Sequence, residues 1–157
     1  MVLKKVISGG QTGADQAGLS AAFYNGIETG GWAPRRYMTK EGPNPDLLRK
    51  YKMTEHQDSG YPQRTFANVK DSDGTIRLAI NFETPGEKCT LKAIKEYKRP
   101  YIDVDLNNPP DPFEVIKWMY KYNIETLNVA GNANQKNKDI YSMAYNYLIP
   151  IFKKMKE

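Results

Sequence analysis

Short apolar blocks recur along this chain, and longer stretches with helical spacing of apolar positions separate them. The blocks are bounded by glycine, proline or polar turns, which is typical of β-strands in a mostly parallel sheet. The predicted strands cover residues 3–7, 27–31, 76–82, 101–106 and 126–130. Alternation of strand and helix predicts the α/β class: a single domain over residues 1–157, with about five mainly parallel strands and helices on both faces.

Helix signals follow most of these strands. The segment after the third strand places Leu91, Ile94 and Tyr97 on one apolar stripe. A further helix begins at Asp111, which can cap it, and its predicted buried stripe includes Phe113. The last helix is predicted over about residues 138–148. The proline at position 150 is predicted to prevent the helix from continuing.

The turn after the first strand is rich in glycine and leads directly into a helix. Glycine permits unusual backbone angles and close approach of backbone N–H groups, and a helix N-terminus attracts anions. The sequence therefore predicts that an anionic group binds here. The candidate binding residues of this turn are Gly9, Gly10, Gln11, Thr12, Gly13 and Asp15.

Two known phosphate-binding patterns do not fit this turn. In the dinucleotide fingerprint a glycine would stand where Gln11 stands, and in a Walker A loop the phosphate-binding lysine would stand where Leu19 stands. Asp15 has two possible roles. It offsets the helix dipole, or it accepts hydrogen bonds from the ribose or pterin groups of a ligand that also carries an anionic part.

Further candidate residues follow the other strands. In a parallel sheet the carboxyl ends of the strands share one edge, so these residues are expected to line one pocket. Arg35 suits a bidentate grip on an oxyanion, and Trp32 is either a core residue or a ring that stacks on the ligand. The complete set outside the first turn is Trp32, Ala33, Arg35, Arg64, Thr84, Gly86, Thr90 and Gly131.

The segment over about residues 37–61 is polar and lacks clean periodicity. We expect an irregular insertion with one short helix near residues 45–52. An irregular stretch of this length is typical either of a functional lid or of a disordered segment.

Composition narrows the range of functions. The 157 residues include one cysteine, Cys89, and one histidine, His56, so we expect no disulfide framework, no metal site and a reducing cytoplasm. No apolar run approaches the ~20 residues of a membrane span, so no membrane partner is expected. The formal net charge of +5 favours anionic ligands, whereas a nucleic-acid partner is not expected.

Several blocks resemble the putative molybdenum carrier family. The resemblance rests on residues 8–15 and 18–19, residues 30–35, residues 61, 64–65, 68–69 and 71–73, and residues 127–131. That family belongs to the wider LONELY GUY and DprA-like (SLOG) group of Rossmann-like proteins, so the resemblance implies a compact Rossmann-like fold over residues 1–157. The resemblance implies a homo-oligomer that binds molybdenum cofactor or a nucleotide along the strand ends.

The chain departs from the pattern of that family in two loops. Residues 85–90 replace a glycine-glycine-threonine turn but keep Gly86 and Thr90, and residues 132–135 replace a loop with proline, arginine and serine. The main hypothesis is a binding or carrier protein for an anionic nucleotide- or pterin-like molecule. The alternative, by analogy with phosphoribohydrolases, is an N-glycosidic hydrolase, with Asp15 and then Glu87 as candidate catalytic carboxylates. The sequence leaves open whether the protein is an enzyme.

Overall fold

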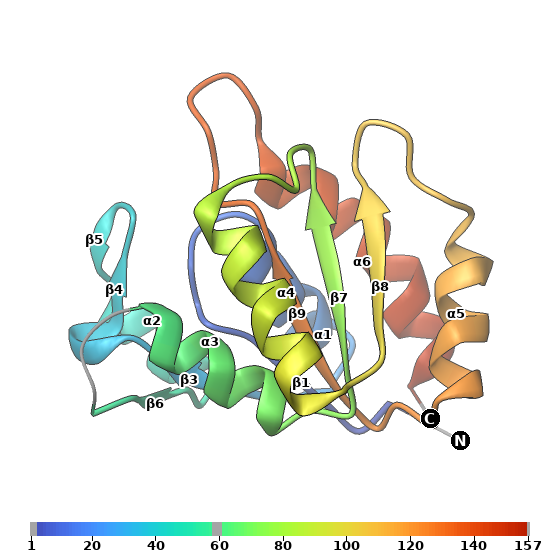
Figure 1. Ribbon diagram of the computed structural model, residues 1–157, viewed down its shortest axis with the longest axis horizontal. Helices are drawn as coiled ribbons and strands as arrows, with labels where there is room; N and C mark the ends of the chain where they lie inside the picture. Colours follow the sequence, from blue (N-terminus) through green and yellow to red (C-terminus); the bar gives the residue numbers. More distant parts are fainter. Residues whose placement is uncertain (1–2, 58–60, 157) are drawn as a thin grey trace.

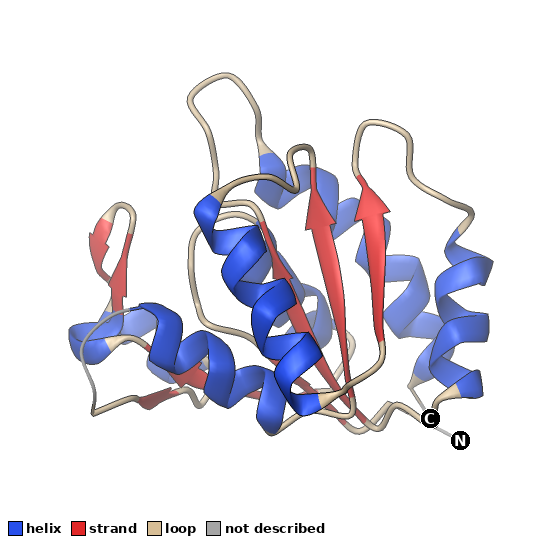
Figure 2. Cartoon of the chain, in the orientation of Figure 1, coloured by secondary structure: helices blue, strands red, loops and turns tan. Residues whose placement is uncertain are grey.

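A five-stranded parallel sheet forms the centre of the molecule in the computed structural model, which describes residues 3–57 and 61–156 (Figures 1 and 2). The strands lie in the order β2-β1-β9-β7-β8, and every pair of neighbours is parallel. Their bounds are β1 (Lys5–Ile7), β2 (Glu28–Gly30), β7 (Gly74–Ala79), β8 (Tyr101–Asp105) and β9 (Thr126–Gly131). The predicted α/β, Rossmann-like class is confirmed.

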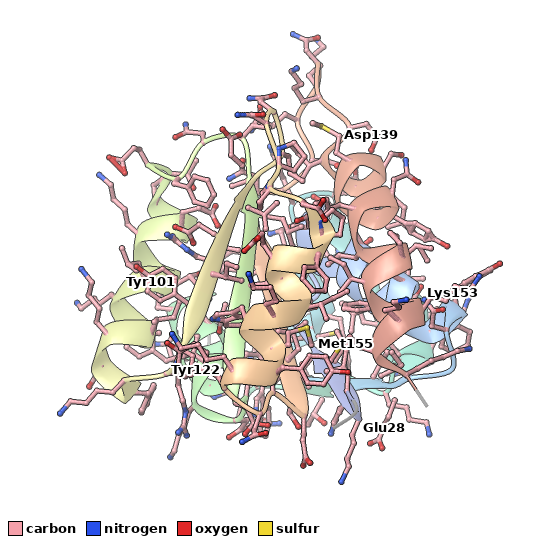
Figure 3. All side chains as sticks on the ribbon, turned by 90° about the vertical axis from the view of Figure 1, so that its right-hand side faces the viewer. Glu28, Tyr101, Tyr122, Asp139, Lys153 and Met155 are labelled. Atoms are coloured by element: carbon pink, nitrogen blue, oxygen red, sulfur yellow. The ribbon has the colours of Figure 1, made fainter. Side chains whose placement is uncertain are left out.

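Helices cover both faces of the sheet. Figure 3 shows α5 and α6 on one side of the strands and α4 on the other. Helix α1 packs against α6, and α3 packs against α4. The bounds are α1 (Ala14–Tyr24), α3 (Tyr61–Lys70), α4 (Pro85–Tyr97), α5 (Pro112–Lys121) and α6 (Ile140–Met155). No helix within residues 3–57 and 61–156 is both long and apolar enough to cross a membrane.

The largest apolar core lies between the sheet and the helices α1, α5 and α6. Strand β7 is buried along its whole length because helices cover both of its faces. Helix α1 approaches β9 closely at Gly18, where an added Cβ would lie 2.6 Å from the Cβ of Val129. A small residue at this position therefore sets the distance between α1 and the sheet.

Three predicted details need correction. The third strand ends at Ala79 rather than at residue 82, because the side chain of Asn132 accepts the next two backbone N–H groups. Helix α6 continues through Pro150 to Met155 instead of ending near residue 148. Phe113, predicted to be buried, is 59% exposed, whereas Met119 of the same predicted stripe is buried together with Val115.

Short regular elements occupy most of the segment that we expected to be irregular. Strands β4 (Met38–Thr39) and β5 (Gly42–Pro43) form an antiparallel hairpin, the short helix α2 (Pro45–Lys50) follows, and β6 (Thr54–Glu55) pairs with β3 (Trp32–Ala33). A second apolar cluster holds these elements against α1; its buried members are Leu19, Ala33, Leu48, Tyr51 and Met53. Residues 58–60 of the segment lie outside the described residues.

Candidate functional site

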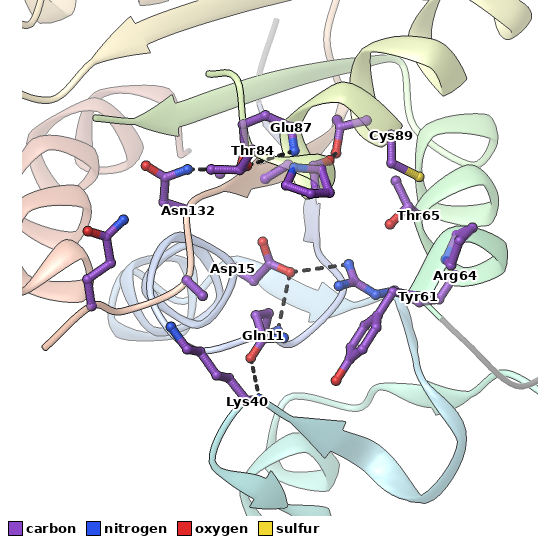
Figure 4. Close-up of a pocket in the computed structure, with 18 residues that line it drawn as sticks. Gln11, Asp15, Lys40, Tyr61, Arg64, Thr65, Thr84, Glu87, Cys89 and Asn132 are labelled. Carbon is purple, nitrogen blue, oxygen red and sulfur yellow. Dashed lines mark hydrogen bonds and ion pairs between the residues drawn. The ribbon is translucent and has the colours of Figure 1, made fainter. Parts of the chain in front are cut away.

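A cavity of about 470 Å³ opens at the carboxyl ends of β1, β7 and β9, where α1 and α4 begin (Figure 4). The β4–β5 hairpin contributes Lys40 to its wall, and α3 contributes Tyr61 and Arg64. The complete lining is Gln11, Asp15, Lys40, Tyr61, Pro62, Arg64, Thr65, Thr84, Pro85, Gly86, Glu87, Cys89, Thr90, Ala130, Gly131, Asn132, Ala133 and Gln135.

The backbone amides of the glycine-rich turn are bound by side chains of the turn itself and of the first turn of α1. The Gln11 N–H donates to the Asp15 carboxylate at 3.2 Å, the Gly10 N–H to the Ser8 hydroxyl at 3.2 Å, and the Thr12 N–H to the Gln11 side-chain oxygen at 3.0 Å. We expected these amides to receive an anionic ligand. Instead, the anion beside this turn is the carboxylate of Asp15.

Asp15 also forms an ion pair with Arg64. The distance between Asp15 Oδ2 and Arg64 Nη1 is 3.4 Å, and the two side chains are only 5% and 13% exposed. Burial raises the pKa of Asp15 to about 6, because the loss of solvation outweighs the stabilising charge of Arg64. Asp15 is therefore a carboxyl that gains or loses a proton near neutral pH.

The Arg64 guanidinium occupies space that is free because residue 9 is a glycine. The guanidinium lies where a Cβ on Gly9 would be, so any larger residue at position 9 would overlap Nη1. The Nε of Arg64 is buried and has no hydrogen-bond partner among residues 3–57 and 61–156. A buried N–H donor without a partner is costly, and a water, an ion or a bound ligand can supply the missing acceptor.

The first turn of α4 holds a second buried carboxyl, Glu87. Its Oε2 accepts hydrogen bonds from the Thr84 hydroxyl at 2.9 Å and from the Asn132 side-chain amide at 2.8 Å, while its backbone N–H donates to the Thr84 hydroxyl. These bonds resemble a capping box and fix the start of the helix. Burial raises the pKa of Glu87, although Thr84 and Asn132 stabilise its charged form.

Arg77 secures the same turn from inside the sheet. It donates to both carboxylate oxygens of Asp103 at 2.7 Å and to the backbone oxygen of Glu87 at 3.0 Å. A buried arginine thus connects β7, β8 and α4 directly behind the cavity.

Many of the predicted residues meet in the cavity. Besides Glu87, these are Gln11, Asp15, Arg64, Thr84, Gly86, Thr90 and Gly131. The other members of the first turn do not line it. Gly9 lies under Arg64, Gly10 packs near Leu48 and Met53, and Thr12 and Gly13 pack against the loop at residues 132–134.

The residues predicted after the second strand lie elsewhere. The indole of Trp32 donates to Asp71 at 2.8 Å, Ala33 is buried in the second apolar cluster, and Arg35 is exposed on the short 3₁₀ helix over Arg35–Tyr37. None of these three lines the cavity. Arg64, which is also among the predicted binding residues, is the arginine that lies beside Asp15.

Asn132 and Lys40 are cavity residues that the sequence did not indicate. Asn132 follows β9 directly and links it to β7 and α4 through its side chain. Its position at a strand end was the available signal. Lys40 comes from the β4–β5 hairpin, where its backbone N–H donates to the Gln11 side chain at 2.7 Å and its Nζ donates to the backbone oxygen of Asn134 at 3.2 Å. No local pattern predicts these contacts.

Metal ligation finds little support in this geometry. Over residues 3–57 and 61–156, no three His, Cys, Asp or Glu side chains lie close enough together to hold a metal ion. Cys89 lines the cavity, and burial raises the pKa of its thiol, so the thiolate form that binds metals is disfavoured.

Comparisons with known proteins agree with this architecture. A model of the circularly permutated YpsA SLOG family matches residues 6–152. The chain is 33% identical to a solved structure of a putative molybdenum carrier protein from Syntrophus aciditrophicus SB, with a TM-score of 0.86 and coverage of 96% of this chain and 95% of that chain. No curated protein matched the chain. The match over nearly all of the chain shows that it belongs to the circularly permutated YpsA family of SLOG proteins.

Proposed function

We propose that this protein binds an anionic nucleotide- or pterin-like small molecule in the cavity between α1, α3 and α4. The observation that carries the proposal is Arg64, a buried guanidinium at the cavity wall whose Nε finds no hydrogen-bond acceptor in the described part of the chain. Arginine forms strong hydrogen bonds with phosphate and other oxyanions, and it keeps its charge when buried. The first turn of α4 adds the positive end of a helix dipole at Gly86.

The size and lining of the cavity suit such a ligand. Its volume of about 470 Å³ is typical of small-molecule sites. The Tyr61 ring lies beside Arg64, with its centroid 5.3 Å from the guanidinium carbon, and provides an aromatic surface at the wall. Gln11 and Thr90 add polar groups for the uncharged part of the ligand.

The name of the structural relative is consistent with a ligand that contains molybdenum. It is described as a putative molybdenum carrier protein, so molybdenum cofactor is one candidate cargo for this chain. The residues present fit the anionic part of that molecule, which Arg64 would hold. They do not offer a ready thiolate for the metal, since the thiol of Cys89 stays protonated.

A thermal-shift screen tests the proposal. The compounds are nucleotides, cyclic nucleotides, ADP-ribose, pterins and molybdate, each at about pH 5 and about pH 8. A ligand at about one hundred times its Kd stabilises the folded state by roughly 2.7 kcal/mol. We expect Arg64→Gln to lose the shift and Arg99→Gln, an exposed arginine outside the cavity, to keep it. If no compound stabilises the wild-type protein at either pH, the proposal is wrong.

Incubation of the bound nucleotide separates a carrier from a hydrolase. A binding or carrier protein returns the nucleotide intact, whereas an N-glycosidic hydrolase releases the free base. We expect the wild-type protein to release no more free base than the Asp15→Asn and Glu87→Gln variants do. Release that Asp15→Asn abolishes would instead assign the cavity to catalysis.

A further inference from the structure

We propose that Asp15 competes with the anionic group of the ligand for Arg64, so that the anion binds together with a proton taken up by Asp15 from solvent. This inference rests on the proposed function and adds the regulation of the same site. It starts from the position of the Asp15 carboxylate, which already occupies the Gln11 N–H and the Nη1 of Arg64.

The balance of charge around Arg64 leads to the same conclusion. Arg64 is the buried cation of the cavity, and Asp15 neutralises it at 3.4 Å. Glu87, the second carboxyl in the cavity wall, raises the pKa of Asp15 through its negative charge. An added anion would therefore enter a site whose buried charges sum to zero or less, where the low dielectric makes repulsion strong.

Besides Asp15, the charged or titratable groups that line the cavity come from α3, α4 and the β4–β5 hairpin. Arg64 and Tyr61 come from α3, Glu87 and Cys89 from α4, and Lys40 from the β4–β5 hairpin. Lys40 is exposed and donates to a backbone oxygen, so solvent screens its charge. Glu87 accepts two side-chain hydrogen bonds that stabilise its charged form. Asp15 lies closest to Arg64, and its protonation restores a net positive charge there.

The direction of the pH dependence follows. The pKa of Asp15 is raised to about 6, so the carboxyl is neutral below that value and ionised above it. A ligand with constant charge should bind most tightly below about pH 6. Its Kd should rise up to about tenfold for each pH unit above the pKa, if binding requires the protonated carboxyl.

Cyclic AMP is a suitable probe because its phosphodiester keeps one negative charge between about pH 5 and pH 8. Isothermal titration calorimetry of the wild-type protein should give a Kd that is up to about 100-fold larger at pH 8 than at pH 5. Titrations at about pH 7 in two buffers with different ionisation enthalpies should report an uptake of about one proton per bound ligand. This measurement uses the wild-type protein, so it does not require that any variant folds.

Two variants identify the carboxyl that takes up the proton. Asp15→Asn keeps an oxygen that accepts from the Gln11 N–H but removes the charge. We expect it to bind cyclic AMP at about pH 8 at least tenfold more tightly than the wild type, with little pH dependence. Glu87→Gln is the comparison in the same cavity. It should still show a loss of affinity with rising pH, with the midpoint moved to lower pH because the charge that raises the pKa of Asp15 is gone.

Four outcomes would show that Asp15 does not compete with the ligand. The wild type could bind with the same Kd at both pH values, or Asp15→Asn could bind at neither pH or more weakly than the wild type. The fourth outcome is that Glu87→Gln loses the pH dependence while Asp15→Asn keeps it. Binding that requires Arg64 but does not depend on pH would contradict the competition and leave the proposed function intact. Failure of this inference can therefore be distinguished from failure of the proposed function.

Discussion

Gly9 and Gly13 lie in the same turn, but a side chain at each position would meet a different kind of neighbour. A Cβ on Gly9 would meet the guanidinium of Arg64, which is the far end of a flexible side chain. A Cβ on Gly13 would meet the backbone of residues 132–134, and Gly13 has a positive φ of 85°. One glycine makes room for a site residue, and the other allows two loops to pack.

Alanine at each position should therefore have a different effect. In Gly9→Ala the guanidinium of Arg64 moves away, so we expect at least a tenfold loss of ligand affinity and a change in unfolding free energy within about 1 kcal/mol. In Gly13→Ala both the backbone contact and the positive φ are unfavourable, so we expect a loss of about 2 kcal/mol or more. Urea denaturation and ligand titration measure both effects. Equal destabilisation in the two variants would contradict this assignment.

Predicted residues line the cavity where they lie near the end of a central strand. Asp15, Thr84, Gly86 and Gly131 follow β1, β7 or β9 closely, and the parallel sheet gathers those ends at one edge. The prediction failed for Arg35, because β2 is an edge strand and the chain turns away after it into β3. The cavity contacts of Lys40 with Gln11 and Asn134 join distant segments, which no local pattern reveals.

At the level of elements, helix α6 shows how tertiary packing overrides a local signal. Proline removes a helical hydrogen bond and crowds the preceding turn, which predicts an end near Pro150. The helix continues because Ile151, Phe152 and Met155 are buried in the main core, while Pro150 itself faces solvent. Burial of apolar side chains of this size contributes about 1.5–3 kcal/mol each, which exceeds the cost of the missing bond.

Replacing this proline should stabilise the protein. In Pro150→Ala the backbone N–H at position 150 returns, and the exposed position needs no repacking. We expect the unfolding free energy to rise by about 1 kcal/mol or more, as measured by urea denaturation. A decrease would indicate that the proline ring contributes packing or restricts the unfolded chain more than it strains the helix.

Capping signals were the most dependable sequence features of the elements. The Asp111 side chain accepts from the Phe113 N–H at 2.9 Å, as predicted for the start of α5, and Asn123 adopts a positive φ of 51° just after its end. The phase of α5 was harder to predict, because Phe113 and Val115 are both apolar and only the contact with the sheet decides which is buried. The two-residue strands β3 to β6 are too short to leave a periodic pattern.

At the level of the whole molecule, the alternation of strands and helices predicts the class but not the strand order. The last strand, β9, lies between β1 and β7, so the sheet is complete only when residues from both ends of the chain meet. The cavity depends on the same arrangement, since Asn132 after β9 connects the loop after β7 to Glu87. Local hydrophobic patterns contain no information about which strands become neighbours.

The largest apolar cluster and the cluster around Leu48 and Met53 differ in size, which predicts that the molecule opens in stages. Strands β7 and β9 belong to the large core, whereas the segment from β3 to β6 rests on the small cluster around Leu48 and Met53. Regions with few buried contacts open locally at low free energy. Native-state hydrogen exchange should therefore be slowest in β7 and β9 and faster in the β4–β5 hairpin.

Ligand binding should change exchange in the hairpin more than in the sheet. The Lys40 N–H is bound to the Gln11 side chain at 2.7 Å, and both residues line the cavity. A bound molecule that contacts Gln11 and Lys40 must leave before the hairpin can move away, so exchange at Lys40 should slow by at least about tenfold. The amides of β8, which lie at the far edge of the sheet, provide the internal control. Unchanged exchange at Lys40 with saturating ligand would mean that the hairpin moves independently of the occupied cavity and does not act as its lid.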